Sequence, residues 1–176
     1  MNQSLKLKEK IGYGFGDFAS SMFWKLFSVY LLFFYTDVFG IAAAAAGTMF
    51  LATRIWDTFL DPIIGVIADR TNTKWGKFRP FLLWMAIPFA IAGVLTFSSP
   101  NFSVTGKLIY AYLTYTLMMM VYSTINVPYA SLMGVMSSNI KERTTLATFR
   151  FVLAFAGSIL VLATAEPLVA ALSKTA

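Results

Sequence analysis

The sequence predicts an all-α polytopic membrane protein with about five membrane-spanning helices. Of its 176 residues, 58% are hydrophobic and only 12% are charged, whereas soluble domains carry about 25% charged residues. The apolar residues form five long runs, each with the roughly 20 residues that cross a bilayer. Basic residues gather between the runs, so the net charge of +6 reflects membrane topology rather than a nucleic-acid surface.

The five spans are expected near residues 11–35, 41–68, 80–98, 107–136 and 144–165. We find no soluble domain or linker between them, so residues 1–176 are treated as one membrane bundle. Transporters built from repeats pack an even set of helices into two halves. Five spans therefore predict an incomplete N-terminal bundle whose C-terminal half is missing.

The distribution of basic residues predicts a cytoplasmic N-terminus. One set of connections carries Lys6, Lys8, Lys10, Arg70, Lys74, Lys77, Arg79, Lys141 and Arg143. The opposite connections carry only Lys107 and Lys174. Basic residues are retained on the cytoplasmic side, so the N-terminus is expected there. We expect the protein in the plasma membrane, most simply a bacterial inner membrane.

The absence of two residue types limits the chemistry of any site. The chain has no Cys, which excludes disulfides and thiolate metal sites, and no His, the usual base and zinc ligand. We therefore expect no structural metal. Because no feature of the sequence implies covalent chemistry, we also expect no enzyme.

Two acidic residues, Asp57 and Asp61, lie inside the second expected span. A carboxylate at the bilayer centre costs roughly 2.5–3.5 kcal/mol on insertion scales, so such residues face a cavity and bind something. At 1.5 Å per residue they lie about 18 and 12 Å deep, with Cβ atoms about 6 Å apart. A bound cation or a proton would relieve their repulsion. Alternatively, Arg54, one turn away, would neutralise one carboxylate in an internal ion pair that only holds the bundle together.

Polar residues on other spans reach similar depths. Ser20 and Ser21 lie about 15 Å deep, Asn126 about 16 Å, Asp17 about 10 Å and Arg150 about 9 Å. On three of the spans, polar and aromatic residues share one face. On the second span these are Arg54, Asp57, Thr58, Asp61 and Gly65; on the first, Tyr13, Asp17, Ser20, Ser21, Trp24 and Ser28; on the fourth, Tyr115, Met119, Tyr122, Ser123, Asn126 and Tyr129. The remaining faces are apolar, which predicts a bundle around a wet cavity.

The residue types in this cavity suit a hard cation and a sugar. Oxygen ligands from Asp57, Asp61 and a hydroxyl such as Ser123 suit Na⁺. Aromatic rings stack on sugar rings, while carboxylate, amide and arginine groups bind hydroxyls. Simpler roles remain open: packing or capping for Asp17, snorkelling for Arg150 and an interhelical hydrogen bond for Asn126.

Four segments resemble the glycoside–pentoside–hexuronide:cation symporters of the major facilitator superfamily. RIWDTFLDPIIGVIADRTNTKWGKFRP resembles that family's second helix and following loop, and GYGFGDFASSMFW its first helix. INVPYASL and FRF resemble its fourth and fifth helices. The resemblance implies twelve spans, of which about five are present, and uptake of a sugar or glycoside coupled to Na⁺, Li⁺ or H⁺, with no other cofactor.

The resemblance also implies roles for individual residues. Asp57 and Asp61 match cation-site acids, and Arg150 matches a sugar-binding arginine. From the resemblance and the polar helix faces together, we expect a cation site at Asp57, Asp61, Ser123 and Asn126. We expect a substrate site at Asp17, Ser20, Ser21, Trp24, Arg54, Tyr122, Asn126 and Arg150. Asp69, Arg70, Lys77 and Arg79 resemble a cytoplasmic gating motif, and we group Glu142 and Arg143 with them.

Three positions depart from the melibiose-transporting members of that family. Asn126 and Ser21 stand where those proteins have aspartates, and Ala130 stands where they have a tryptophan. A different sugar or a different ion is therefore expected. Two other functions remain open: a truncated, non-transporting fragment or interaction module, and a related transporter of an amphiphile or anion.

Overall fold

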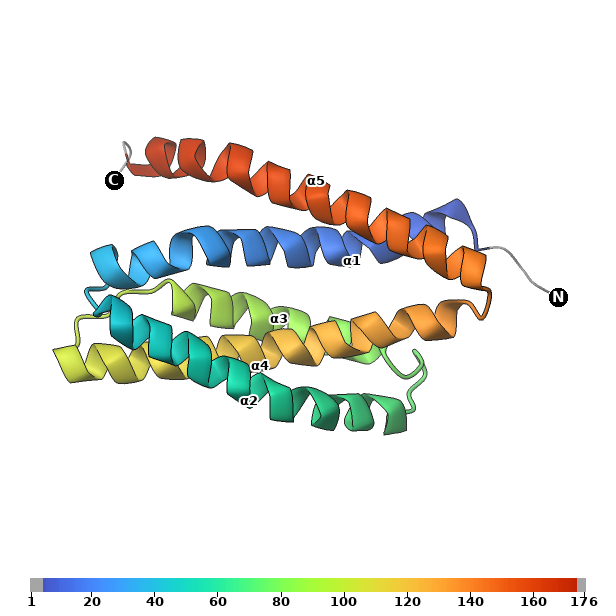
Figure 1. Cartoon of the computed structure of the whole chain (residues 1–176), viewed down its shortest axis with the longest axis horizontal. Helices are drawn as coiled ribbons and strands as arrows, with labels where there is room; N and C mark the ends of the chain where they lie inside the picture. Colours follow the sequence, from blue (N-terminus) through green and yellow to red (C-terminus); the bar gives the residue numbers. More distant parts are fainter. Residues whose placement is uncertain (1–4, 174–176) are drawn as a thin grey trace. The chain divides into compact units, whose positions relative to one another are not determined.

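Helices account for nearly all of the computed structural model, which describes residues 5–173 (Figure 1). The all-α prediction is confirmed. The α-helices are α1 (Leu7–Leu26), α2 (Ala43–Arg70), α3 (Arg79–Thr96), α4 (Val104–Met136) and α5 (Ile140–Ser173). After α1 the chain stays helical through two π-helical segments, η1 (Phe27–Leu31) and η2 (Phe34–Val38). Each expected span overlaps one of these helices, and Lys174 lies outside the described residues.

Three of the described helices, α3, α4 and α5, are long and apolar enough to cross a membrane. The other two, α1 and α2, contain charged residues inside their apolar runs. Arg54, Asp57 and Asp61 interrupt the apolar run of α2, and Asp17 and Lys25 interrupt that of α1. That α1 and α2 also cross the bilayer stays a prediction, because their charged residues need a cavity inside the bundle.

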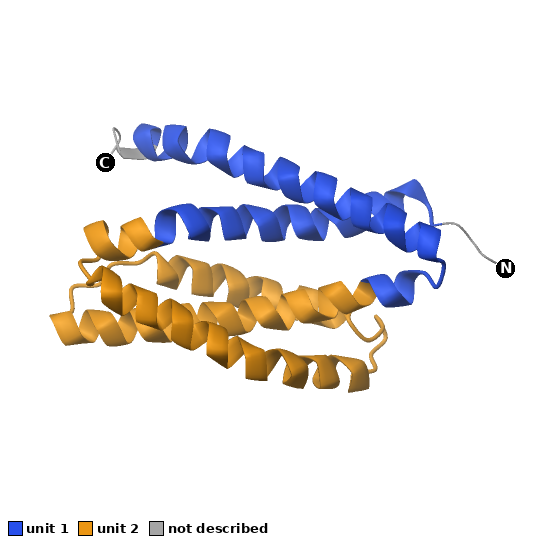
Figure 2. Ribbon diagram, in the orientation of Figure 1, with its two compact units in different colours: residues 1–31, 133–176 blue, residues 32–132 orange. Residues whose placement is uncertain are grey.

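The chain divides into two compact units, which we describe separately (Figure 2). The first unit contains the residues up to Leu31 and those from Met133 onward, so it consists mainly of α1 and α5. These two helices run parallel, since Gly14 lies against Phe149 and Leu153 while Gly157 lies against Phe18. Glycine lets helix backbones approach closely in this way.

A Cβ atom on Gly157 would lie 2.5 Å from the carbonyl oxygen of Phe18, and one on Gly14 would lie 3.0 Å from that of Phe149. Two polar contacts lie at the N-terminal end of this helix pair, one between α5 and α1 and one within α1. Lys10 Nζ lies 2.9 Å from Glu142 Oε2, and the backbone N–H of Lys6 donates to the Glu9 carboxylate at 2.7 Å.

The second unit contains residues 32–132, with α2 and α3 against α4. Thr48 Oγ1 lies 2.9 Å from the Tyr112 hydroxyl near the start of α2. A Cβ on Gly65, further along, would lie 3.9 Å from Val127. Helices α2 and α4 are therefore parallel. Helix α3 is antiparallel to α4, because it places Thr96 near Thr114 and Phe89 near Tyr122.

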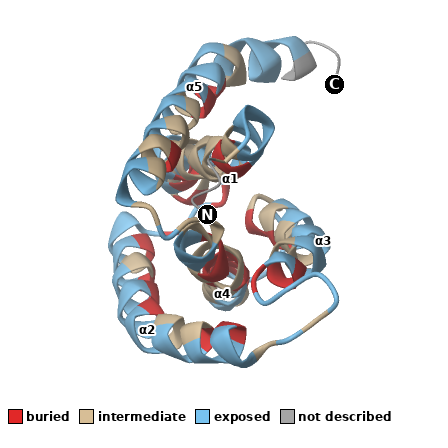
Figure 3. Ribbon diagram, turned by 90° about the vertical axis from the view of Figure 1, so that its right-hand side faces the viewer, coloured by how far each residue is buried: buried red, intermediate tan, exposed pale blue. Residues whose placement is uncertain are grey.

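Two contacts close the ends of the second unit. Ala68, Phe78, Phe81 and Leu132 form an apolar cluster where α2 ends and α3 begins. At the other end Lys107, in the first turn of α4, donates to the Phe39 carbonyl at 2.9 Å. Large parts of each helix remain exposed (Figure 3), as expected of helices that face lipid.

Candidate functional site

The candidate site residues predicted from the sequence fall into two sets, one in each unit. Asp17, Ser20, Ser21, Trp24, Glu142, Arg143 and Arg150 belong to the first unit. Arg54, Asp57, Asp61, Asp69, Arg70, Lys77, Arg79, Tyr122, Ser123 and Asn126 belong to the second. Each set contains one cluster with a recognisable chemistry.

The cluster in the second unit is the acidic pair of α2. Asp57 is 8% exposed and Asp61 is half-buried. One carboxylate oxygen of each is buried and has no hydrogen-bond partner among the described residues. Buried polar atoms are nearly always paired in native proteins, so two unpaired carboxylate oxygens one helical turn apart call for an explanation such as a bound cation or proton.

The packing of α2 on α4 brings Ser123 to the level of this pair. The contacts Thr48–Tyr112 and Gly65–Val127 bracket it on both sides. Interpolation at 1.5 Å per residue places Asp57 about level with Met120, and Asp61 about level with Ser123. Ser123 is 6% exposed. Asn126 is half-buried less than one turn further along the same helix.

Pro62, which follows Asp61 directly inside α2, changes the backbone beside the pair. Proline has no N–H, so the carbonyl of Thr58 loses its usual helical donor. Thr58 lies between the two aspartates in the sequence. Carboxylate, carbonyl and hydroxyl oxygens are the ligands of hard cations. Within residues 5–173, no group of three or more acidic, His or Cys residues could hold a metal ion.

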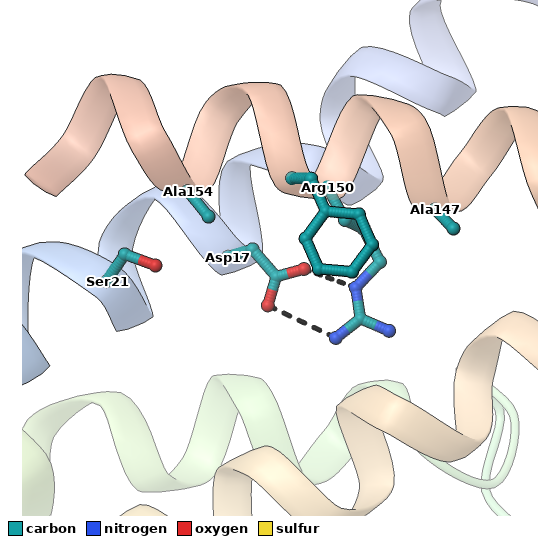
Figure 4. Close-up of a pocket in the computed structure, with 6 residues that line it drawn as sticks. Asp17, Ser21, Ala147, Arg150 and Ala154 are labelled. Atoms are coloured by element: carbon teal, nitrogen blue, oxygen red, sulfur yellow. Dashed lines mark hydrogen bonds and ion pairs between the residues drawn. The ribbon is translucent and has the colours of Figure 1, made fainter.

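The cluster in the first unit is a pocket of about 300 Å³ between α1 and α5 (Figure 4). Its polar side chains are Asp17, Ser21 and Arg150. Arg150 donates to both carboxylate oxygens of Asp17, through Nε to Oδ2 and through Nη2 to Oδ1, the latter at 3.2 Å. The Arg150 guanidinium also lies 5.5 Å from the centre of the Tyr13 ring. The pocket volume is at the lower end of the range typical of small-molecule sites.

Three residues that line this pocket were missed by sequence reasoning: Ala147, Phe151 and Ala154. Ala147 and Ala154 precede and follow Arg150 by three and four residues, so they lie on its face of α5. Their small side chains leave space beside the guanidinium. The signal available in the sequence was this helical spacing around Arg150.

The other nominated substrate residues lie outside that pocket lining. Ser20 and Trp24 are half-buried on α1. Tyr122 is buried on α4, with its ring centre 6.3 Å from that of Phe89. Arg54 is exposed, and its backbone carbonyl accepts a hydrogen bond from Thr58 Oγ1 at 3.0 Å.

The candidate gating residues are of two kinds: exposed charged residues and residues that make contacts at helix ends. Asp69, Arg70, Lys77 and Arg79 are exposed and form no ion pair with any other described residue. Arg143 donates to the carbonyls of Ser137 at 2.7 Å and Gly134 at 3.1 Å, at the end of α4. Within the first unit, Arg143 thus caps the C-terminal end of α4.

Glu142 is the acidic residue paired with Lys10 at the start of α5. The hydrogen bond from Lys10 is the main reason why the pKa of Glu142 lies below the ordinary value of 4.5; the charge of Lys10 adds to it and desolvation opposes it. The carboxylate is therefore ionised throughout the neutral range.

Comparison with known proteins gives one family and several close relatives. The MFS/sugar transport protein family matches residues 12–176. YagG of Escherichia coli (strain K12), assigned as a glycoside/cation symporter, is 50% identical over 97% of this chain and 37% of its own length. The inner membrane symporter YicJ of the same strain is 48% identical over 96% of this chain and 36% of its own length.

The isoprimeverose transporter of Lactiplantibacillus pentosus is 46% identical over 92% of this chain and 34% of its own length. The chain thus spans little more than a third of the curated relatives that it matches.

Proposed function

Because the chain belongs to the MFS/sugar transport protein family, a family of membrane transporters and not of enzymes, we propose that it forms the N-terminal helices of a sugar:cation symporter. The whole protein would take up a sugar or glycoside together with Na⁺, Li⁺ or H⁺. The N-terminus would face the cytoplasm, and the protein would lie in the plasma membrane.

The observation that supports the cation half of this proposal is the acidic pair on α2. Asp57 and Asp61 each have a buried oxygen without a hydrogen-bond partner among the described residues. A monovalent cation or a proton would satisfy these oxygens and remove the repulsion between the carboxylates. Ser123 and Asn126 on the parallel helix α4 would supply further oxygens.

The pocket between α1 and α5 supports the sugar half. Arg150 and Asp17 together offer donors and acceptors to hydroxyl groups, and Ser21 adds a hydroxyl of its own. The formal charges of the pair cancel, so a neutral polyhydroxyl ligand could hydrogen-bond there without leaving a charge unpaired. Ser20 and Trp24, also on α1, would extend this site, and Arg54, Tyr122 and Asn126 stay candidate substrate residues of the second unit.

In the proposed mechanism the cation binds first and the sugar second. The cation draws Asp57 and Asp61 together and fixes α2 against α4. The sugar then binds, and the two halves of the whole transporter rock between inward and outward openings. Ion pairs of the candidate gating residues would break and re-form in this motion. These residues are Asp69, Arg70, Lys77 and Arg79, with Glu142 and Arg143.

Uptake into vesicles tests the proposal. The complete protein that contains this chain would be reconstituted and offered a panel of labelled methyl glycosides under Na⁺, Li⁺ or pH gradients. We expect one of these gradients to drive accumulation, and Asp57→Asn and Asp61→Asn to abolish it. Asp37→Asn is the control, because Asp37 is an exposed acid near the end of η2. Accumulation by both α2 variants would refute the assignment of the pair.

A further inference from the structure

Lys25 lies inside the expected first span, and the proposed function does not use it. Counted at 1.5 Å per residue over the span 11–35, it lies about 21 Å from the cytoplasmic end and about 15 Å from the other end. A lysine side chain is shorter than either distance, so its ammonium cannot reach the headgroups by snorkelling. A charged group at this depth is costly unless it faces a partner or a polar cavity inside the bundle.

The acidic side chains of the first unit do not provide that partner. Those of Glu9, Asp17 and Glu142 bind the other groups described above. The remaining one, Glu166, is exposed and follows Gly157 by about two and a half turns, so it lies on the side of α5 away from α1. Lys25 therefore has no counter-ion among the described residues of its unit.

The position of Lys25 on α1 places it next to the pocket between α1 and α5. Lys25 follows Met22 and Ser21 at the spacing that puts side chains on one face of a helix. Met22 lies against Gly157 of α5, and Ser21 lines the pocket. Long side chains in a helix lean toward the preceding turn. The half-buried Lys25 thus brings a positive charge to the pocket beside Ser21.

We propose that Lys25 forms an anion site at this end of the pocket, which binds the carboxylate of an acidic glycoside. The inference rests on the proposed function and narrows its substrate class to glycuronides. The formal charges of Asp17 and Arg150 cancel, so Lys25 gives the site one uncompensated positive charge. A single carboxylate offsets this charge, whereas a neutral glycoside leaves the ammonium without a counter-ion.

The spacing of the polar groups allows one sugar ring to contact all of them. The Cβ atoms of residues one helical turn apart, such as Ser21 and Lys25, are separated by about 6 Å. Hydroxyl groups on one side of the ring would meet Ser21 and Arg150, while a carboxylate on the other side meets Lys25. A hydrogen bond between an ammonium and a carboxylate is about twice as strong as one between neutral groups. The carboxylate therefore decides which sugars bind.

A structural role for Lys25 predicts different behaviour. In that case an acidic side chain from the remainder of the complete protein pairs with Lys25 permanently. Removing the lysine would leave that acid buried and uncompensated, which is strongly destabilising. If Lys25 instead waits for the carboxylate of a ligand, the protein without ligand holds an unpaired charge, and removing that charge stabilises it.

The first measurement uses this difference and needs no substrate. The thermal unfolding of the complete protein would be followed in detergent for Lys25→Met, which keeps the length of the side chain and removes its charge. Lys8→Met is the matched control, because Lys8 is an exposed lysine of the same helix. We expect Lys25→Met to raise the unfolding temperature and Lys8→Met to leave it unchanged. A lowered unfolding temperature for Lys25→Met would overturn the inference in favour of a structural ion pair.

The second measurement compares affinities for two matched pairs of ligands. Methyl glucuronide differs from methyl glucoside, and methyl galacturonide from methyl galactoside, only in carrying a carboxylate in place of the hydroxymethyl group. We expect the unmodified complete protein to bind a glycuronide about 10- to 100-fold more tightly than its neutral counterpart, as for a hydrogen bond between charged groups. Lys25→Met should remove this preference by weakening only the glycuronide, and Lys25→Arg should retain it.

The outcomes separate this inference from the function on which it rests. Tight binding of the neutral glycosides without preference for a glycuronide would leave the proposed function in place and refute the anion site. A preference that persists in Lys25→Met would also refute it, because another group would then bind the carboxylate. Failure of the unmodified protein to bind any of the four ligands, or to accumulate any glycoside, would contradict the proposed function and the anion site together.

Discussion

Replacing Gly157 by alanine should weaken the contact between α1 and α5. The new Cβ would lie 2.5 Å from the Phe18 carbonyl oxygen and 3.2 Å from Met22 Cγ. Favourable non-bonded contacts begin at about 3.5 Å, so the helices would have to separate by about 1 Å. The obstructing oxygen belongs to the backbone of α1 and cannot rotate away, so the strain cannot be relieved by a change of rotamer.

The expected loss follows from two opposing effects. Overpacking a close contact costs about 1–3 kcal/mol, while replacing glycine by alanine inside a helix gains about 0.5–1 kcal/mol. Gly12→Ala on α1 is the matched control, because its Cβ would meet nothing within 4 Å. The difference between the two variants cancels the helix gain and should equal the overpacking cost, about 1–3 kcal/mol.

Reversible unfolding in mixed detergent micelles, followed by far-UV circular dichroism, gives the free energies of unfolding of both variants. We expect Gly157→Ala to be the less stable of the two. If it is as stable as Gly12→Ala, the close approach of α1 and α5 at Phe18 is wrong, and with it the register that pairs Asp17 with Arg150.

Two further predictions concern the ends and the pocket of the first unit. Because the pKa of Glu142 is lowered by Lys10, its stabilising effect should be complete above the ordinary value of 4.5 and should be lost as the pH falls through the lowered pKa; acid titrations of stability should show this decline in the unmodified protein and not in Glu142→Gln. Ala154→Leu should fill the pocket beside Arg150 and weaken glycoside binding at least about 10-fold, measured by calorimetry, while Ala163→Leu on an exposed part of α5 should bind normally; equal binding by the two variants would exclude the pocket as the sugar site.

The fold class followed from the sequence because long apolar runs admit few alternatives. The helix ends were less predictable, and α5 begins at Ile140 and ends at Ser173, beyond the expected residues 144–165. Counting residues against the bilayer thickness measures the apolar part of a helix, whereas hydrogen bonding continues the helix past it. The π-helical turns at Phe27–Leu31 and Phe34–Val38 leave no clear mark in hydrophobic periodicity.

The candidate site was predictable in its residues but not in its partnerships. Asp57 and Asp61 stood out because charges inside an apolar run are costly. Asp17 and Arg150 were placed at nearly equal depths, about 10 and 9 Å. Their pairing, however, depends on α1 lying beside α5, and no local pattern specifies which helices become neighbours. The small residues Ala147 and Ala154 were missed because alanine in an apolar helix is unremarkable until a pocket forms around it.

If Asp57 and Asp61 bind the coupling cation, binding of the cation and of the glycoside should be thermodynamically linked. The affinity of the complete protein for the transported glycoside would be measured with and without the coupling ion, in the unmodified protein, Asp57→Asn and Asp61→Asn. Coupling between sites typically changes affinity by about 5- to 150-fold. We expect the ion to tighten glycoside binding in the unmodified protein and to have no effect in either variant. An ion effect of the same size in both variants would contradict this role of the acidic pair.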